Sequence, residues 1–192
     1  MLRKVISGGQ TGVDQAALRA TLRVNAMVGG PATGGLAVGG WCPPGRECES
    51  GKIPAGFPLR ETERDRSPWA PDIPRSLRTE RNVRDSEATL IVLPGGMASD
   101  AALRDKGTRW TASCAARFGK ALYFIQVHNH GAPDRIAAWI DERHIATLNV
   151  AGPSENTAPG IGESAFGTLL SGFMRVMEYS GDIERCANRT FS

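Results

Sequence analysis

The chain has 192 residues, of which 41% are hydrophobic and 22% charged, and a formal net charge of +3. This is an ordinary globular composition and excludes a mostly disordered chain. No run approaches the roughly 20 apolar residues of a membrane-spanning helix, and the first residues lack the apolar stretch of a signal peptide. Four cysteines without a crowded pattern do not predict a disulfide framework. We therefore expect a cytoplasmic protein with reduced thiols and no membrane association.

Arginine dominates the basic residues, but its distribution does not predict a nucleic-acid partner. The densest stretch of arginine, residues 60–85, carries nearly as many acidic residues. Such a balanced segment is typical of a solvated surface rather than of a stripe that binds nucleic acid.

Short apolar segments alternate with helical patterns along the chain. Strands are predicted at residues 3–7, 88–93, 121–127 and 145–150. Helices are predicted at residues 13–22, 75–83, 108–118, 133–143 and 164–179. Thr11 followed by Asp14 indicates a capping box at the start of the first helix. Residues 28–74 are rich in Gly and Pro and predict an irregular excursion.

This alternation predicts an α/β fold. We expect a Rossmann-like, doubly wound and mostly parallel sheet with helices on both faces, formed by a single domain over residues 1–192. Ligands of such sheets bind beyond the carboxyl ends of the strands.

Glycine-rich turns follow three of the predicted strands, at residues 7–12, 94–108 and 152–162. Because the carboxyl ends of parallel strands share one edge, we expect these loops to converge. Glycine lets the backbone approach a ligand closely, and the N-terminus of the following helix offers N–H groups to an anion. The loops therefore predict a ligand with a phosphate or another oxyanion; tight turns without a ligand are the alternative.

The first loop matches neither a Walker A loop nor the dinucleotide motif G-x-G-x-x-G. No acidic residue ends a second strand in the usual ribose-binding place. Both observations argue against an ordinary NAD-dependent dehydrogenase.

Five blocks, in order, resemble the molybdenum cofactor carrier family. They are residues 7–18 (SGGQTGVDQAAL), 39–46 (GGWCPPGR), 78–91 (RTERNVRDSEATLI), 107–120 (GTRWTASCAARFGK) and 148–161 (LNVAGPSENTAPGI). The resemblance implies a non-catalytic, homo-oligomeric protein that binds, protects or transfers molybdenum cofactor, a pterin with a phosphate and a molybdenum oxyanion. Molybdoenzymes would be its partners. Molybdate or a nucleotide remains an alternative ligand. The Gly-rich residues 28–35 and the long segment 94–106 depart from the family pattern.

The resemblance and the loops together suggest where the ligand would bind. Residues of the first loop are expected to hold one anion: Gly8, Gly9, Gln10, Thr11 and Gly12. Further contacts are expected from Gly107, Thr108, Thr111, Arg78, Thr79, Asn82, Arg46, Gly152, Ser154 and Glu155.

A nucleotide-directed enzyme is the alternative function, because the family is similar to lysine-decarboxylase-like phosphoribohydrolases. Those enzymes carry Pro-Gly-Gly-x-Gly-Thr-x-x-Glu, and the Glu acts on the glycosidic bond. Alignment on Pro94 places Ala102 at the Glu position, and alignment on Gly107 places Thr111 there. A hydrolase would need another acid, such as Asp14 or Glu155. The sequence therefore favours binding over catalysis, with a nucleotide-sensing module as a third hypothesis.

Other conspicuous residues have plainer explanations. His128 and His130 match no zinc spacing and are expected in a solvated loop. Trp41 could stack on a flat ligand or pack under the excursion. The last predicted helix is apolar on more than one side, which suits a subunit interface or the core.

Overall fold

A computed structural model describes residues 1–97, 102, 103 and 105–189 of the chain. Its centre is a parallel five-stranded sheet with the order β2-β1-β9-β7-β8. The strands are β1 (Lys4–Ile6), β2 (Ala37–Gly39), β7 (Ala88–Leu93), β8 (Ala121–Gln126) and β9 (Thr147–Ala151). The predicted α/β class with a mostly parallel sheet is confirmed.

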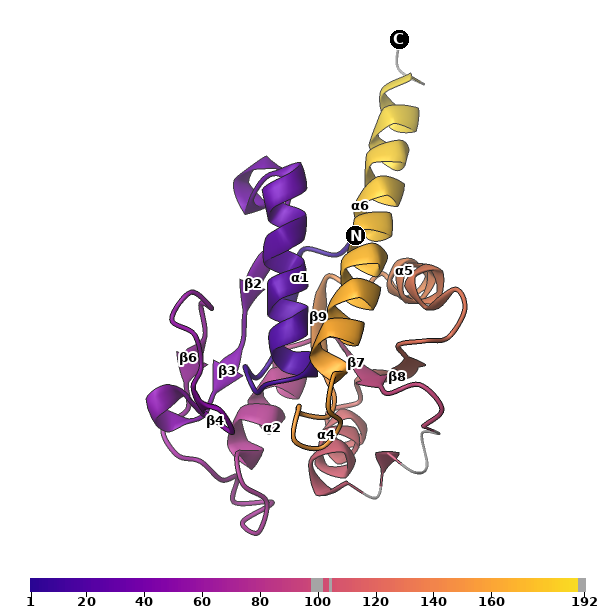
Figure 1. Ribbon diagram of the computed structural model, residues 1–192. Helices are drawn as coiled ribbons and strands as arrows, with labels where there is room; N and C mark the ends of the chain where they lie inside the picture. The colour runs from indigo at the N-terminus through magenta and orange to yellow at the C-terminus, as the bar shows by residue number, and fades with distance from the viewer. Residues whose placement is uncertain (98–101, 104, 190–192) are drawn as a thin grey trace.

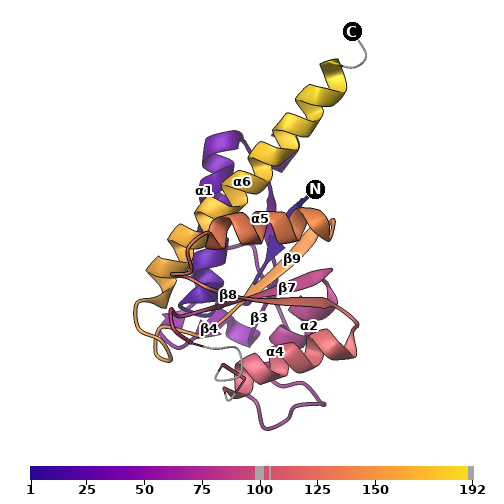
Figure 2. The same cartoon turned by 90° about the vertical axis from the view of Figure 1, so that its right-hand side faces the viewer.

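Helices cover both faces of the sheet (Figures 1 and 2). One face carries α1 (Val13–Val28), α5 (Ala132–Glu142) and α6 (Ile161–Arg189), with α6 packed against both of the others. The opposite face carries α2 (Ser76–Arg84) and α4 (Lys106–Arg117), which pack against each other. The C-terminal part of α6 extends beyond the body of the molecule (Figure 1).

The connections diverge at the middle of the sheet. The chain leaves β1 through α1 and β9 through α6 on one face, whereas it leaves β7, the neighbour of β9, through α4 on the other. Strand β9 lies between β1 and β7 and pairs with both, with Asn149 opposite Ile6 on one side and Thr89 on the other. Connections that leave neighbouring strands toward opposite faces open a crevice at the carboxyl edge.

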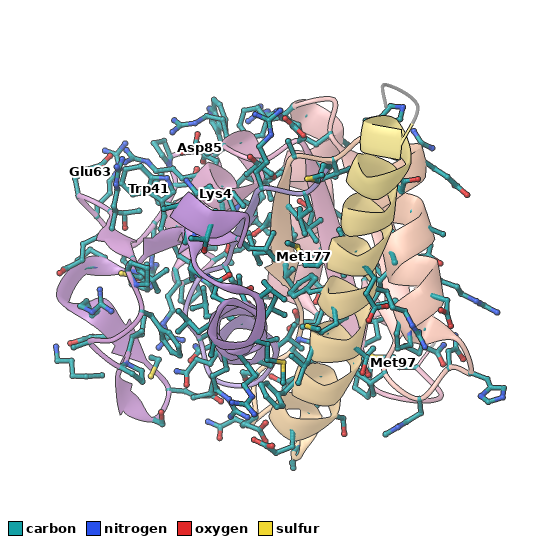
Figure 3. The ribbon with its side chains drawn as sticks, turned by 90° about the horizontal axis from the view of Figure 1, so that it is seen from above. Lys4, Trp41, Glu63, Asp85, Met97 and Met177 are labelled. Carbon is teal, nitrogen blue, oxygen red and sulfur yellow. The ribbon has the colours of Figure 1, made fainter. Side chains whose placement is uncertain are left out.

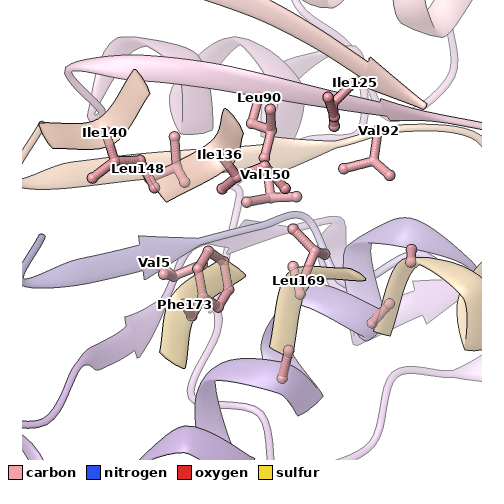
Figure 4. Close-up of a cluster of buried hydrophobic side chains, with 14 of the residues drawn as sticks. Val5, Leu90, Val92, Ile125, Ile136, Ile140, Leu148, Val150, Leu169 and Phe173 are labelled. Atoms are coloured by element: carbon pink, nitrogen blue, oxygen red, sulfur yellow. The ribbon is translucent and has the colours of Figure 1, made fainter. Parts of the chain in front are cut away.

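The main core lies between the sheet and the α1, α5 and α6 face. Val5, Leu90, Leu148 and Val150 from the central strands meet side chains of α5 and α6, among them Phe173 (Figure 4). All six residues of β7 are buried, as expected of a strand with both faces covered.

The excursion at residues 28–74 is more ordered than its composition suggested. It contains the edge strand β2, whose three residues, one of them a glycine, show no hydrophobic periodicity that would predict a strand. It also contains the turns η1 (Pro31–Thr33) and η2 (Pro44–Arg46) and the short strands β3 (Trp41–Cys42), β4 (Glu47–Cys48), β5 (Gly51–Lys52) and β6 (Arg60–Glu61). Cys42, Cys48, Ile53 and Phe57 form a small apolar cluster with Leu18 of α1. This cluster attaches the excursion to the body.

Other element boundaries differ from the predictions by a few residues, except at two helices. Helix α1 continues to Val28 and α6 runs from Ile161 to Arg189, so both are longer than their apolar patterns indicated. Within the described residues, no helix is both long and apolar enough to cross a membrane.

Phe173 should be a dominant contributor to stability, because its side chain is 0% exposed in the main core. We predict that Phe173→Ala lowers the free energy of unfolding by about 3–5 kcal/mol in urea denaturation. Ser113→Ala, at an exposed residue of α4, serves as the control and should change it by less than about 0.5 kcal/mol. Equal effects of the two substitutions would contradict this assignment of the core.

Candidate functional site

A cavity of about 210 Å³ lies at the carboxyl ends of β1, β7 and β9, on the face covered by α2 and α4. It is lined by the loop after β1 and the first turn of α1, by α2, by the start of α4, by β7, and by the end of β9 with the loop that follows. The lining residues are Gly8, Gln10, Asp14, Arg75, Arg78, Thr79, Asn82, Ile91, Asp105, Gly107, Thr108, Thr111, Asn149, Val150, Ala151, Gly152, Pro153, Ser154 and Thr157. This is the place where the divergent connections predict a ligand.

An ion pair forms one wall of the cavity. Arg78 Nη1 lies 2.6 Å from Asp14 Oδ2, which joins α2 to the first turn of α1. The Arg78 guanidinium passes directly over Gly8: a Cβ atom at Gly8 would lie 1.6 Å from Nη1. Only glycine at position 8 therefore permits this pair.

The pair is deeply placed. The side chain of Asp14 is 4% exposed and that of Arg78 is 16% exposed. The Gln10 N–H also donates to Asp14 Oδ2, at 3.3 Å. Burial raises the pKa of Asp14 above its ordinary value, and the Arg78 guanidinium reverses only part of that effect. Arg78 keeps capacity for another partner, because its buried Nε has none within the described residues.

The start of α4 provides a second wall. The Asp105 carboxylate caps this helix by accepting the Thr108 N–H at 2.7 Å. The Thr111 hydroxyl donates to the Gly107 carbonyl at 3.0 Å. Asp105 therefore already satisfies one N–H group at this terminus, and the neighbouring Gly107 N–H, which has no partner among the described residues, is a candidate donor for an anion.

A buried polar pair lies at the bottom of the cavity. Asn149 on β9 donates through Nδ2 to Thr89 Oγ1 on β7 at 3.2 Å, and both residues are buried. Asn149 lines the cavity, so its amide oxygen is an acceptor for a ligand N–H or O–H.

Glu49 joins the excursion to the two loops at the cavity. Its carboxylate accepts the Thr11 hydroxyl and the Asn156 N–H, the latter at 3.0 Å. Its own N–H donates to Gln10 Oε1 at 2.9 Å. Burial would raise the pKa of Glu49, but the hydrogen bonds from Thr11 and Asn156 outweigh it and the pKa lies below its ordinary value. Glu49 is thus a charged anchor for the loop after β9.

The structure brings most of the predicted site residues together. Those that line the cavity are Gly8, Gln10, Arg78, Thr79, Asn82, Gly107, Thr108, Thr111, Gly152 and Ser154. Asn82 is nevertheless occupied, because its side-chain amide accepts from the N–H and donates to the carbonyl of Trp41, at 2.8 and 3.0 Å. It holds β3 against α2.

The remaining predicted residues lie outside the cavity lining. Gly9 faces Leu59 and Ile53 of the excursion. Arg46 donates to the carbonyls of Leu59, Pro54 and Phe57 and so holds the excursion together.

Three further predicted residues shape the loops. Glu155 accepts the N–H groups of Gly160 and Gly162, at 2.8 and 2.6 Å, where α6 begins. Gly12 is the N-cap of α1 and has a φ of 76°, which favours glycine. The predicted capping box is wrong: no side chain caps α1, because Thr11 is bonded to Glu49 and Asp14 to Arg78.

The three glycine-rich loops converge only in part. The loops after β1 and β9 meet at the cavity, and the start of α4 joins them. Pro94 and Gly95 lie instead beside His128, in a separate hollow at the start of α6. Part of the predicted loop, residues 98–101 and 104, is outside the described residues.

Trp41 lies outside the cavity and packs between charged groups (Figure 3). Its indole N–H donates to Asp85 at 2.7 Å, and the Arg81 guanidinium lies 4.7 Å from its ring centroid. Arg81 in turn pairs with Glu63 at 2.6 Å. Stacking on a ligand in the cavity is therefore not the role of Trp41.

Sequence reasoning missed several cavity residues, chiefly Arg75, Asp105 and Asn149. Asp14 is predicted as a helix cap or as the acid of the alternative hydrolase, but not as the partner of Arg78. Asn149 did carry a signal, since it is a polar residue inside the apolar strand β9.

Comparisons with known proteins agree with this architecture. The model of the circularly permutated YpsA SLOG family matches residues 5–173. The chain belongs to this family. A 1.45 Å crystal structure of a Syntrophus aciditrophicus SB protein named "Putative molybdenum carrier protein" shares 31% sequence identity, with a TM-score of 0.70. That match covers 90% of this chain and 94% of the other. No curated protein matches the chain.

Gly8→Ala tests the geometry of the ion pair. The added methyl group must displace the Arg78 guanidinium and leave Asp14 buried without its cation. We predict a loss of about 3 kcal/mol in the free energy of unfolding at pH 8. The loss should shrink toward pH 5, because a protonated Asp14 needs no cation.

Gly30→Ala is the matched control, since nothing lies within 4 Å of a Cβ at that position. It should change the free energy of unfolding by less than about 0.5 kcal/mol at either pH. A loss for Gly8→Ala that is the same at pH 5 and pH 8 would contradict the role given to Asp14.

Proposed function

We propose that this protein binds molybdenum cofactor in the cavity at the carboxyl edge of its sheet, and protects or transfers it without catalysis. The observation that carries the proposal is the Arg78 guanidinium, which lines a polar cavity closed by two glycine-containing loops and a helix start. The named molybdenum carrier, which is similar over almost its whole length, supports the molybdenum-related role.

The cavity groups suit the two chemical ends of such a ligand. Arg78 and the N–H groups near Gly8 and Gly107 are donors for a phosphate or a molybdenum oxyanion. The amide oxygen of Asn149 is an acceptor for a pterin N–H.

Cavity size limits how much of the ligand is enclosed. Pockets that bury a drug-sized ligand have volumes of about 300–1,000 Å³, whereas this cavity measures about 210 Å³. It would enclose one end of the cofactor, and the remainder would lie in the mouth between α2 and the loop after β9.

The cavity favours binding over glycoside hydrolysis. Its two carboxylates are already engaged, Asp14 with Arg78 and Asp105 with the Thr108 N–H. Thr111, which takes the position of the phosphoribohydrolase Glu in one alignment, donates to a backbone carbonyl. A nucleotide is the alternative ligand, because its phosphate needs the same donors.

The test is the composition of the purified protein. Prepared under anaerobic conditions from cells that make excess cofactor, the wild type should carry near-stoichiometric molybdenum by elemental mass spectrometry. Acid oxidation should release fluorescent pterin. Arg78→Gln should retain less than about a tenth of both, since a hydrogen bond from a charged group contributes about 1.5–3 kcal/mol.

Arg64→Gln is the control, because Arg64 is exposed in the excursion and lies outside the cavity. It should carry as much molybdenum and pterin as the wild type. If the wild type gave neither signal but carried a bound nucleotide, the nucleotide would replace molybdenum cofactor as the proposed ligand.

We also propose that the protein self-associates. Molybdoenzymes would be the recipients of the cofactor. Leu22, Met27 and Val28 of α1 are exposed, and Met174 and Met177 of the adjacent α6 are only partly buried. We expect light scattering to give at least twice the 20.5 kDa mass of one chain. A monomer at micromolar concentration would contradict this expectation.

A further inference from the structure

We propose that Asp14 is an internal counter-ion which holds Arg78 until a ligand binds, and that an incoming dianion shares Arg78 while Asp14 takes up one proton from solvent. The inference rests on the proposed function in so far as it requires an anion at Arg78. It adds that binding is coupled to protonation of a residue of the protein.

An anion in the cavity and Asp14 would share the Arg78 guanidinium, with Arg75 as a second cation in the lining. Asp14 Oδ2 lies 2.6 Å from Arg78 Nη1, and Arg78 also lines the cavity. A dianion at this group would bring negative charge next to a carboxylate that has almost no access to water. Two like charges in such a site cannot both persist at low cost, and the group that can take up a proton does so.

Within the described residues, Asp14 has no ion-pair partner other than Arg78. The Gln10 N–H contributes a further hydrogen bond but no charge. Burial already raises the pKa of Asp14, and negative charge from a bound anion would act in the same direction.

Arg75, the residue before α2, and Asp105, the residue before α4, also line the cavity. Cys42 on β3 lies within the electrostatic reach of Arg78, and Glu49 lies within that of Arg75. Burial raises the pKa of Cys42, so it remains a neutral thiol at neutral pH. The pKa of Glu49 lies below its ordinary value, so Glu49 remains charged. Asp105 accepts the Thr108 N–H on the wall opposite Asp14.

The direction of the coupling follows from linkage. When the complex holds one more proton than the separate partners, the association constant falls as pH rises, by up to about tenfold per pH unit. The association constant begins to fall at the pH where Asp14 ionises in the ligand-free protein. It stops falling at the higher pH where Asp14 ionises in the complex. Below and above that interval the association constant is flat.

Calorimetric titration with sulfate and with molybdate between pH 6 and pH 8.5 tests the inference, because neither dianion titrates in this range. Repeating each titration in buffers with different ionisation enthalpies gives the number of protons exchanged. Wild-type protein should take up as much as one proton per anion. Asp14→Asn should take up none, show no pH dependence, and bind sulfate at least severalfold more tightly at pH 8.

The matched control is a variant with the same change of charge outside the cavity. Glu163→Gln makes the same change of charge at an exposed residue of α6 that pairs with Arg19, and should behave as the wild type. If Asp14→Asn does not fold, Asp14→Ser replaces it.

The outcomes separate the two proposals. Anion binding without proton uptake in the wild type, or uptake that persists without Asp14, would overturn this inference and leave the proposed function standing. Failure of both anions to bind at millimolar concentration would overturn the inference together with the anion site of the proposed function.

Discussion

The ion pair between Asp14 and Arg78 is the constraint on which the candidate site depends. It links helices from opposite faces of the sheet across the end of β1, at the point where the connections diverge. Its position requires glycine at residue 8, because any side chain there would occupy the space of the guanidinium. A buried pair of this kind contributes little to stability, since desolvation offsets the attraction between the charges. Its chemistry therefore points to a ligand rather than to the fold.

The other polar groups keep this pair at the cavity. Asn82, one turn after Arg78 on α2, fixes β3 through both the oxygen and the nitrogen of its side-chain amide. Glu49 fixes the excursion to the loops after β1 and β9. Within the excursion, Cys42, Cys48, Ile53 and Phe57 pack against Leu18 of α1. An irregular segment thus acts as the support for two loops that the sheet alone would leave free on one side.

The fold was predictable because its signals are local. Apolar strands such as β7 and the periodic pattern of α4 give their elements directly, and parallel strands force their loops to one edge. Strand β2 was not predicted, because three residues that include a glycine show no hydrophobic periodicity. The site was predictable only as a set of loops. Asp14 was assigned to a helix cap, since its partner is 64 residues away and no local pattern reports such a contact.

The most direct test of the account is the position of a bound anion. A crystal of the protein soaked with molybdate would show molybdenum by its anomalous scattering. The account predicts a peak within contact of the Arg78 guanidinium, between Gly8 and the start of α4. A well-occupied peak elsewhere, for example in the hollow between Lys4 and Arg60, with none at Arg78, would contradict it.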